Sequence, residues 1–135
     1  MGQLNKTQQA EMRRLFEENG LTPDDVFKHQ HYIIITRGGI EKIQAKHDIR
    51  ISYETEYYNP EHGMLTLKAF AYRNSDPDNI IQTYGEVNPK NNRNAYPWAM
   101  AEKRCLSRAT LKLAGLYAHG VFGEDEADDF KKPAK

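Results

Sequence analysis

Three segments with the alternating pattern of β-strands follow one another between Ile49 and Val87, and no other feature of the sequence constrains the fold as strongly. Residues 49–57 alternate apolar or aromatic side chains with Arg, Ser and Glu, residues 64–73 place Leu or Ala at every second position, and residues 80–87 form the third segment. Turn-forming clusters of Asn, Asp, Pro and Gly separate them. Because such short connections cannot cross over a sheet, consecutive strands must be antiparallel neighbours. The sequence therefore predicts a β-meander.

Helix signals lie on both sides of this meander. Pro97 occupies the favoured first position of the longest helix, and Gly115 follows its last turn as a C-cap. The expected elements outside the meander are a helix over residues 7–19, a short helix over 22–28, a strand over 32–36, a short helix over 40–47 and a long helix over 97–114. We therefore expect an α+β fold in which an antiparallel meander of three or four strands packs against a long helix in the C-terminal half, preceded by short N-terminal helices.

The chain of 135 residues has the length of one domain. Its single cysteine, Cys105, cannot form an internal disulfide, so we expect a protein of the reducing cytoplasm. The longest apolar run, residues 32–35, is far shorter than a membrane span, so we expect no membrane partner. We expect residues 1–123 to form a single α+β domain and residues 124–135 to form a flexible tail, acidic at first and then basic.

The formal net charge of +0 argues at first against a nucleic-acid partner, but the charges are segregated along the chain. Residues 88–112 carry six bases and one acid, a net charge of +5. Residues 113–130 carry five acids and no Lys or Arg, a net charge of −5. The neutral total is therefore the sum of a basic block and an acidic block.

The long helix carries most of the basic block. Arg104, Arg108 and Lys112 fall within about 80° of the helix circumference, because each step of four residues advances the direction by only about 40°. An apolar stripe is expected on the opposite side; it comprises Ala99, Leu106, Ala109 and Leu113, flanked by Trp98 and Cys105. The sequence thus predicts an exposed basic ridge that is suited to a polyanion. The alternative is a solvated helix face, or one that pairs with the tail acids.

Aromatic residues are frequent on the predicted strands. They are Tyr53, Tyr57, Phe70, Tyr72 and Tyr84, with Tyr58 near the first turn. Rings on an open sheet can stack on the bases of single-stranded DNA while cations contact its phosphates. Lys68 shares a face of its β-strand with Phe70 and Tyr72, which suits this use. Core or cross-strand packing is the alternative for each ring.

Motifs of enzymes are missing from the sequence. It contains no P-loop, no G-x-G-x-x-G and no G-x-S-x-G, and Cys105 lies at the edge of the packing stripe, which favours a core role. We therefore expect no enzymatic activity, no cofactor, no metal and no small-molecule substrate. His29 and His31 have a spacing compatible with a metal, so an enzyme that uses them with the acids of residues 124–129 stays an alternative.

Residues 85–130, GEVNPKNNRNAYPWAMAEKRCLSRATLKLAGLYAHGVFGEDEADDF, carry a family resemblance. The region resembles the signature of phage-type single-strand annealing proteins of the Erf/RecT kind, with a helix rich in Ala and Lys/Arg, an early Tyr, a Gly-containing exit and an acidic cluster. The resemblance implies a basic groove between meander and helix that holds single-stranded DNA along a ring or filament of protomers. It also implies strand annealing without a nucleotide cofactor.

The sequence thus predicts single-stranded DNA binding and annealing in phage or mobile-element recombination, by a protein that forms a homo-oligomer. The expected DNA-binding residues are Lys90, Arg93, Tyr96, Lys103, Arg104, Arg108 and Lys112. Trp98 is a further candidate for stacking on a base, although it also lies near the packing face. The alternative is a protein-interaction or oligomerisation module in which the basic helix docks on an acidic segment of a partner.

Overall fold

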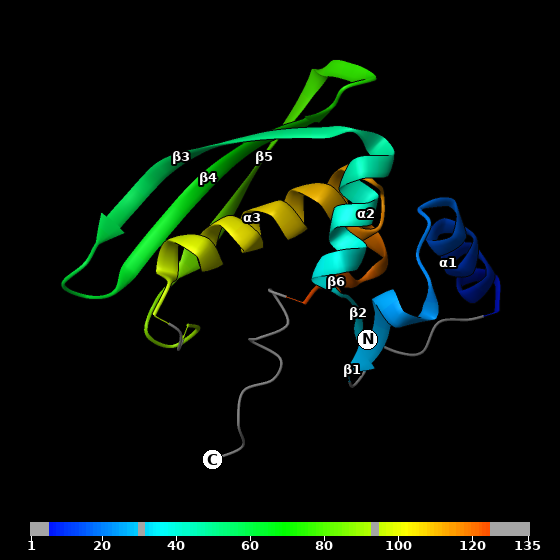
Figure 1. Cartoon of the computed structure of the whole chain (residues 1–135), viewed down its shortest axis with the longest axis horizontal. Coiled ribbons are helices and arrows are strands. Elements are labelled where there is room, and N and C mark those ends of the chain that lie inside the picture. Colours follow the sequence, from blue (N-terminus) through cyan, green and yellow to red (C-terminus); the bar gives the residue numbers. More distant parts are fainter. Residues whose placement is uncertain (1–5, 30–31, 93–94, 125–135) are drawn as a thin grey trace.

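The computed structural model describes residues 6–29, 32–92 and 95–124, with the side chains of His29 and Ala118 excepted. Its elements in chain order are α1 (Lys6–Glu18), the 3-10 turn η1 (Pro23–Asp25), β1 (Val26–His29), β2 (Tyr32–Ile35), α2 (Arg37–His47), β3 (Ile49–Asn59), β4 (Met64–Arg73), β5 (Asp76–Val87), α3 (Pro97–Leu113), the 3-10 turn η2 (Tyr117–His119) and β6 (Val121–Gly123). The strands form two sheets, β3-β4-β5 and β1-β2-β6 (Figure 1). The predicted α+β class is confirmed.

The meander β3-β4-β5 packs one face against α3. Both pairings are antiparallel, and the alternate residues Leu65, Leu67 and Ala69 of β4 point to the helix and are buried. Small side chains on α3 let it lie close to the strands. A Cβ added at Gly85 of β5 would collide with the carbonyl oxygen of Ala101 and would lie 2.9 Å from Cys105 Sγ. The helix therefore rests directly on the backbone of β5.

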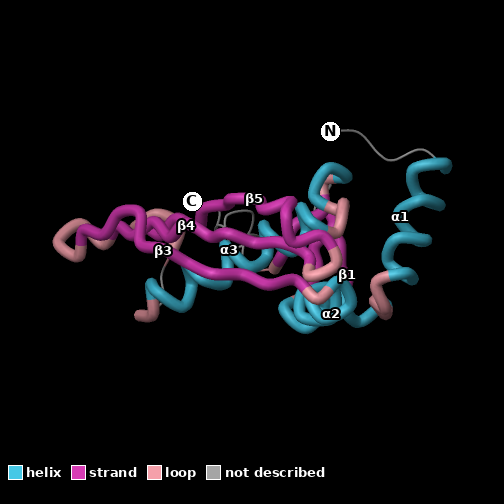
Figure 2. The backbone as a smooth tube through the Cα atoms, turned by 90° about the horizontal axis from the view of Figure 1, so that it is seen from above, coloured by secondary structure: helices cyan, strands magenta, loops and turns pink. Residues whose placement is uncertain are grey.

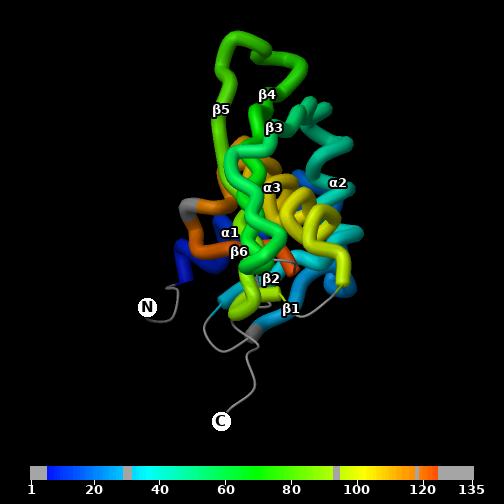
Figure 3. The backbone as a smooth tube through the Cα atoms, turned by 90° about the vertical axis from the view of Figure 1, so that its left-hand side faces the viewer, coloured from blue at the N-terminus to red at the C-terminus, as the bar shows by residue number. Residues whose placement is uncertain are grey.

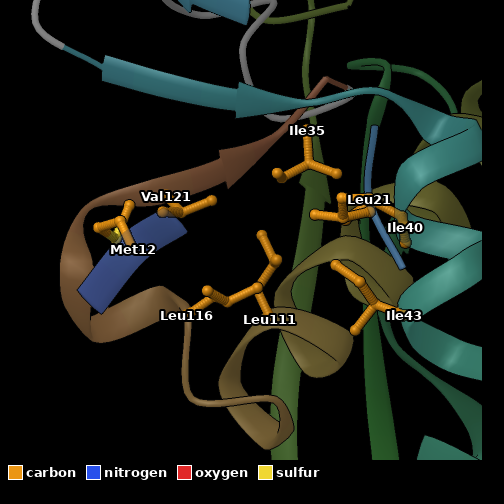
Figure 4. Packing of buried hydrophobic residues seen from close by; sticks show 8 residues of the cluster. All are labelled: Met12, Leu21, Ile35, Ile40, Ile43, Leu111, Leu116 and Val121. Carbon is orange, nitrogen blue, oxygen red and sulfur yellow. The ribbon is translucent and has the colours of Figure 1, made fainter. Parts of the chain in front are cut away.

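The opposite side of α3 is also covered. Leu111 and the following Leu116 pack with Ile40 and Ile43 of α2, with Ile35 of β2, and with residues of α1 and β6 (Figure 4). All eight side chains of this second core are buried. Figure 3 shows the resulting order, with α3 between the meander and α2. The long helix is thus the middle layer of the fold.

The N-terminal region differs from the prediction in one element. Residues 22–28 were expected to be helical, but only Pro23–Asp25 form a turn, and β1 follows at Val26. β1 pairs antiparallel with β2, which places Val26 opposite Ile35 and Phe27 opposite Ile34. The apolar side chains of this segment gain more from pairing with an isoleucine-rich strand than from a short, exposed helix.

The number of strands also differs. The meander has three strands, while the strand predicted over residues 32–36 belongs to the second sheet, where β6 pairs parallel with β2. Sequence analysis did not predict β6, because three residues are too few for a periodic pattern. β5 begins at Asp76, earlier than the predicted Ile80, so the turn before it is shorter than expected.

An irregularity in β3 changes the faces of two tyrosines. The register shifts between Thr55 and Tyr57, so that Thr55 lies opposite Leu67 but Tyr57 lies opposite Thr66. Tyr57 was expected on the same face as Tyr53, yet the extra residue turns it to the open face of the sheet. Tyr58, opposite the buried Leu65, points to the side of α3 instead.

The predicted tail begins at Glu124, the last residue before the undescribed end of the chain. Its backbone N–H donates to the carbonyl of Ile35 at 2.8 Å, and its Oε1 accepts from the N–H of Arg37 at 3.0 Å. The remaining tail, residues 125–135, lies outside the described residues. Within the described part of the chain, none of the helices has the length and apolarity to cross a membrane.

Helix α1 lies at the side of the molecule, away from the meander (Figure 2). A buried polar contact holds its C-terminal end. Asn19, which is buried, donates from its amide to the carbonyl of Leu15 at 2.7 Å and accepts at Oδ1 from His47 Nε2, also at 2.7 Å. Burial, followed by the positive charges of Arg73 and Lys46, lowers the pKa of His47 below its ordinary value of 6.5.

We expect Gly85→Ala to destabilise the protein by about 1–3 kcal/mol, because a side chain there must push α3 off β5. Urea unfolding measures the effect. Gly38→Ala is the matched control, since a Cβ at this helical position meets only Thr36 Oγ1, at 3.9 Å. The control should be neutral or slightly stabilising. Equal stability of the Gly85→Ala variant and the wild type would contradict the close packing.

We expect acidification below about pH 6.5 to destabilise the protein through His47. Its pKa is lower in the folded state, so the unfolded chain takes up the proton first as the pH falls, and stability decreases until the folded pKa is reached. Urea midpoints at about pH 7.5 and about pH 5.5 measure the loss. The loss should be smaller in His47→Gln, and unchanged in the control His62→Gln, which alters an exposed turn residue.

Candidate nucleic-acid interface

Arg104 is not part of an exposed ridge, contrary to the sequence prediction. The residue is only 2% exposed. Its Nη1 donates to the carbonyl of Glu86 at 2.7 Å and to Asn91 Oδ1 at 3.1 Å, and its Nη2 donates to the carbonyl of Asn91. The guanidinium therefore fastens the loop over residues 88–92 to α3. A group held in this way positions its neighbours and does not present its donors to a phosphate.

Arg108 lies one turn further along the same side of α3. Its Nη1 donates to the carbonyl of Tyr84 and to Glu86 Oε1, the latter at 3.0 Å. Together with Arg104, it satisfies two carbonyls of β5, which is an edge strand of the meander. Edge strands need their free backbone groups satisfied or protected. The two arginines thus close one edge of the sheet.

The predicted ridge failed because α3 is packed on two sides. The side that rests on the meander presents Ala101, Cys105 and Ala109, whereas Ala99 of the predicted stripe is exposed. On the far side, Ser107 and Thr110 are buried together with Leu111. Small polar residues do not identify a packing face in a sequence, so the second buried face went undetected.

Two predicted lysines of α3 lie in different parts of the helix. Lys103 is partly exposed in the N-terminal half. Lys112 is exposed in the last turn, where its Nζ lies 5.4 Å from the centroid of the Tyr117 ring. Lys112 is therefore about two and a half turns of the helix beyond Lys103 and about one turn beyond Arg108.

The open face of the meander carries aromatic residues but is not basic. Lys68 Nζ lies 5.6 Å from the centroid of Phe70, 5.9 Å from that of Tyr84 and 3.5 Å from Glu56 Oε1. By register, Glu54 lies beside Lys68, and Glu86 shares the face. Arg50, also on this face, pairs with Asp48. Acids therefore balance the cations along these strands, and this face does not favour phosphates.

A different region brings predicted residues together. The turn between β3 and β4, the loop over residues 88–92 and the start of α3 meet at one end of the molecule, which we call the hairpin end (Figure 1). A Cβ on Gly63 in the turn would lie 3.5 Å from Pro89 in the loop, so these segments are in contact. The exposed side chains of the hairpin end include Tyr58, Met64, Tyr96 and Trp98, the cation Lys90, and Glu61 and His62 of the turn.

Tyr58 and Trp98 form an aromatic pair within the hairpin end. Their ring centroids are 4.9 Å apart and their planes are tilted by 54°. Tyr96, the residue at the N-cap of α3, is 72% exposed. The sequence predicted Tyr96 and Lys90 as DNA-binding residues and Trp98 as a further stacking candidate, whereas Tyr58 was named only among the aromatic residues of the strands. No signal in the sequence predicts the shift in β3 that turns Tyr58 toward the helix.

The described residues offer little to covalent or metal chemistry. Cys105 is fully buried, which confirms its predicted core role, and burial raises the pKa of its thiol to about 12. Among the described residues, no three His, Cys, Asp or Glu side chains gather in a way that could hold a metal ion. His31, the side chain of His29, Arg93 and the acids of residues 125–129 lie outside the described residues.

Comparisons with models of protein families, with curated proteins and with solved structures found no match. The functional assignment therefore depends on the geometry and charge of the hairpin end.

We expect Arg104→Met to destabilise the protein by about 1–3 kcal/mol, because the carbonyls of Glu86 and Asn91 lose a buried donor. Urea unfolding measures the effect. Lys112→Met is the matched control, since it removes a positive charge from an exposed position of the same helix, and it should stay within about 0.5 kcal/mol of the wild type. Equal effects of the two substitutions would show that Arg104 has no structural role.

Proposed function

We propose that this protein binds single-stranded DNA and promotes the annealing of complementary strands, without a nucleotide cofactor, as a homo-oligomer in phage or mobile-element recombination. We infer a cytoplasmic location, because the lone cysteine of the chain is a free thiol and proteins of a reducing compartment do not depend on disulfides.

The observation that carries the proposal is the composition of the hairpin end. Three large aromatic side chains, Tyr58, Tyr96 and Trp98, are exposed there beside the exposed Lys90. Aromatic side chains stack on bases of any sequence, and lysines contact the phosphates between them. Exposed rings together with an exposed cation are the combination that single-strand binding needs.

The electrostatics of α3 support the same surface. Its first turn contains no acidic residue, so the positive end of the helix dipole faces the hairpin end without a compensating charge from that turn. The order of a meander and a following helix agrees with the resemblance to Erf/RecT-like proteins, but α3 rests directly on β5 at Gly85, so the proposed DNA site lies at the hairpin end and not in a groove between meander and helix.

In this proposal the predicted residues divide into two roles. Lys90 and Lys103 contact phosphates and Tyr96 contacts a base or sugar, whereas Arg104 and Arg108 hold the loop and the edge of β5 that carry the site. Lys112 contacts the DNA only when the bound single-stranded DNA is long enough to follow α3 to its C-terminal end.

A second candidate function is supported by the open face of the meander. Ile80 and Tyr84 are exposed on β5, and Tyr57 is exposed on β3, on a face that carries balanced charges. Such a surface is suited to another protein or a second copy of this chain. Light scattering with and without oligonucleotide separates the two functions, because a pure interaction module assembles but binds no DNA.

We expect the affinity for a single-stranded oligonucleotide to fall steeply with salt, measured by fluorescence anisotropy. Lys90→Ala/Lys103→Ala should weaken binding and reduce the slope of log affinity against log salt by about 0.7 for each lost phosphate contact. The control Lys28→Ala/Lys46→Ala removes the same charge from exposed positions on β1 and α2 and should leave the slope unchanged. Equal slopes for both double variants would contradict the placement of the site.

Annealing itself is measured with two labelled complementary oligonucleotides in the absence of ATP. The protein should accelerate duplex formation, and the Lys90→Ala/Lys103→Ala variant should do so less. Binding without acceleration would reduce the proposal to single-strand binding alone.

A further inference from the structure

The aromatic pair of Tyr58 and Trp98 is the most unusual feature of the hairpin end. The two rings touch each other, yet Tyr58 remains 47% exposed and Trp98 43% exposed. Large aromatic rings bury more surface area than other side chains when they enter a core. A pair of contacting rings that stays half exposed to water therefore offers a surface on which a further planar group can pack.

Two independent features of the backbone produce this pair. The register shift in β3 turns Tyr58 to the face of the sheet that α3 covers. The hairpin of β3 and β4 extends past the first turn of α3 (Figure 1), and Tyr58 of this hairpin meets Trp98 in that first turn. Both rings are attached to rigid elements, which keeps the pair in place without a ligand.

The charges around the pair indicate which part of a nucleotide lies against it. Glu102 follows Trp98 by four residues and lies within about 40° of it around the helix, and it is exposed. Lys103 lies about 140° away, on another side of α3. A phosphate is repelled by Glu102 and attracted by Lys103. The side of the helix that carries Trp98 therefore suits an uncharged base, while the backbone of the strand follows the side that carries the lysine.

We propose that Tyr58 and Trp98 form a stacking site for one unpaired nucleobase. This inference rests on the proposed function and deepens it by naming the group that is recognised. The base extends the existing aromatic stack and covers the exposed part of the two rings. Because every base has two flat faces, the site accepts any sequence.

The site also accounts for a preference for single strands. A paired base has both faces covered by its neighbours in the duplex and cannot reach Trp98 without unstacking. Phosphate contacts alone would favour the duplex, since a duplex carries more charge per unit length than a single strand.

The chain provides its own probe, because Trp98 is its single tryptophan. The protein is titrated with an oligothymidine and with an abasic strand of the same length, which carries the same phosphates but no bases. Oligothymidine should quench the fluorescence of Trp98, and the abasic strand should bind more weakly and leave the emission unchanged. Quenching of the same size by both strands would overturn the inference.

Variants provide a second readout by anisotropy. Tyr58→Ala and Trp98→Ala should each weaken binding of oligothymidine by about 5-fold to 150-fold, the range for loss of one stacked base, with little effect on the abasic strand. Trp98→Phe should retain most of the affinity. The matched control is Tyr57→Ala, because Tyr57 is the adjacent residue with the same 47% exposure but lies on the opposite face of the strand. Urea unfolding verifies that each variant is folded.

The outcomes separate this inference from the proposed function. If oligothymidine binds but Tyr58→Ala and Trp98→Ala weaken it no more than Tyr57→Ala, the proposed function holds and the stacking site is wrong. If no oligonucleotide binds at all, both are wrong. If the emission of Trp98 depends on protein concentration without DNA, a second copy of the chain occupies the pair, and this also overturns the inference.

Discussion

The contact of α3 with the backbone of β5 at Gly85 is the interaction on which the rest of the structure depends. Because a glycine faces small residues of the helix there, α3 approaches the sheet closely enough for Arg104 and Arg108 to reach the carbonyls of β5. The same position leaves the far side of α3 free to bury Leu111 against α2 and the second sheet. The contact at Gly85 thus sets the distance between α3 and the meander, while the other face of the helix packs in the second core.

The two arginines connect this packing with the candidate site. They satisfy edge carbonyls of β5, and Arg104 also binds Asn91 in the loop that leads toward the start of α3. The loop in turn contacts the turn between β3 and β4, through Pro89 and Gly63. The exposed aromatic and basic residues of the hairpin end are therefore held by the structural core.

Much of the fold could be predicted because its signals are local. The alternation in β4, the proline at the start of α3 and the glycines that follow the helices each act through neighbouring residues. The site was harder to predict. Arg104 has the spacing of a surface residue on a helical wheel, but its burial depends on β5 and Asn91, which are distant in the sequence. Tyr58 was named among the aromatic residues of the strands, but its position beside α3 could not be predicted, because a register shift follows from the pairing of two strands and the pattern within one strand does not indicate it.

The sequence by itself determined the α+β class, the order of the meander and the long helix, and the basic character of residues 88–112. Those properties follow from local periodicity, turn chemistry and composition. Only the tertiary structure decided which cations are buried and which are exposed, and which aromatic rings meet. The physical reason is that burial depends on all the elements packed around a residue, and α3 has neighbours on two sides whereas a periodic pattern indicates one.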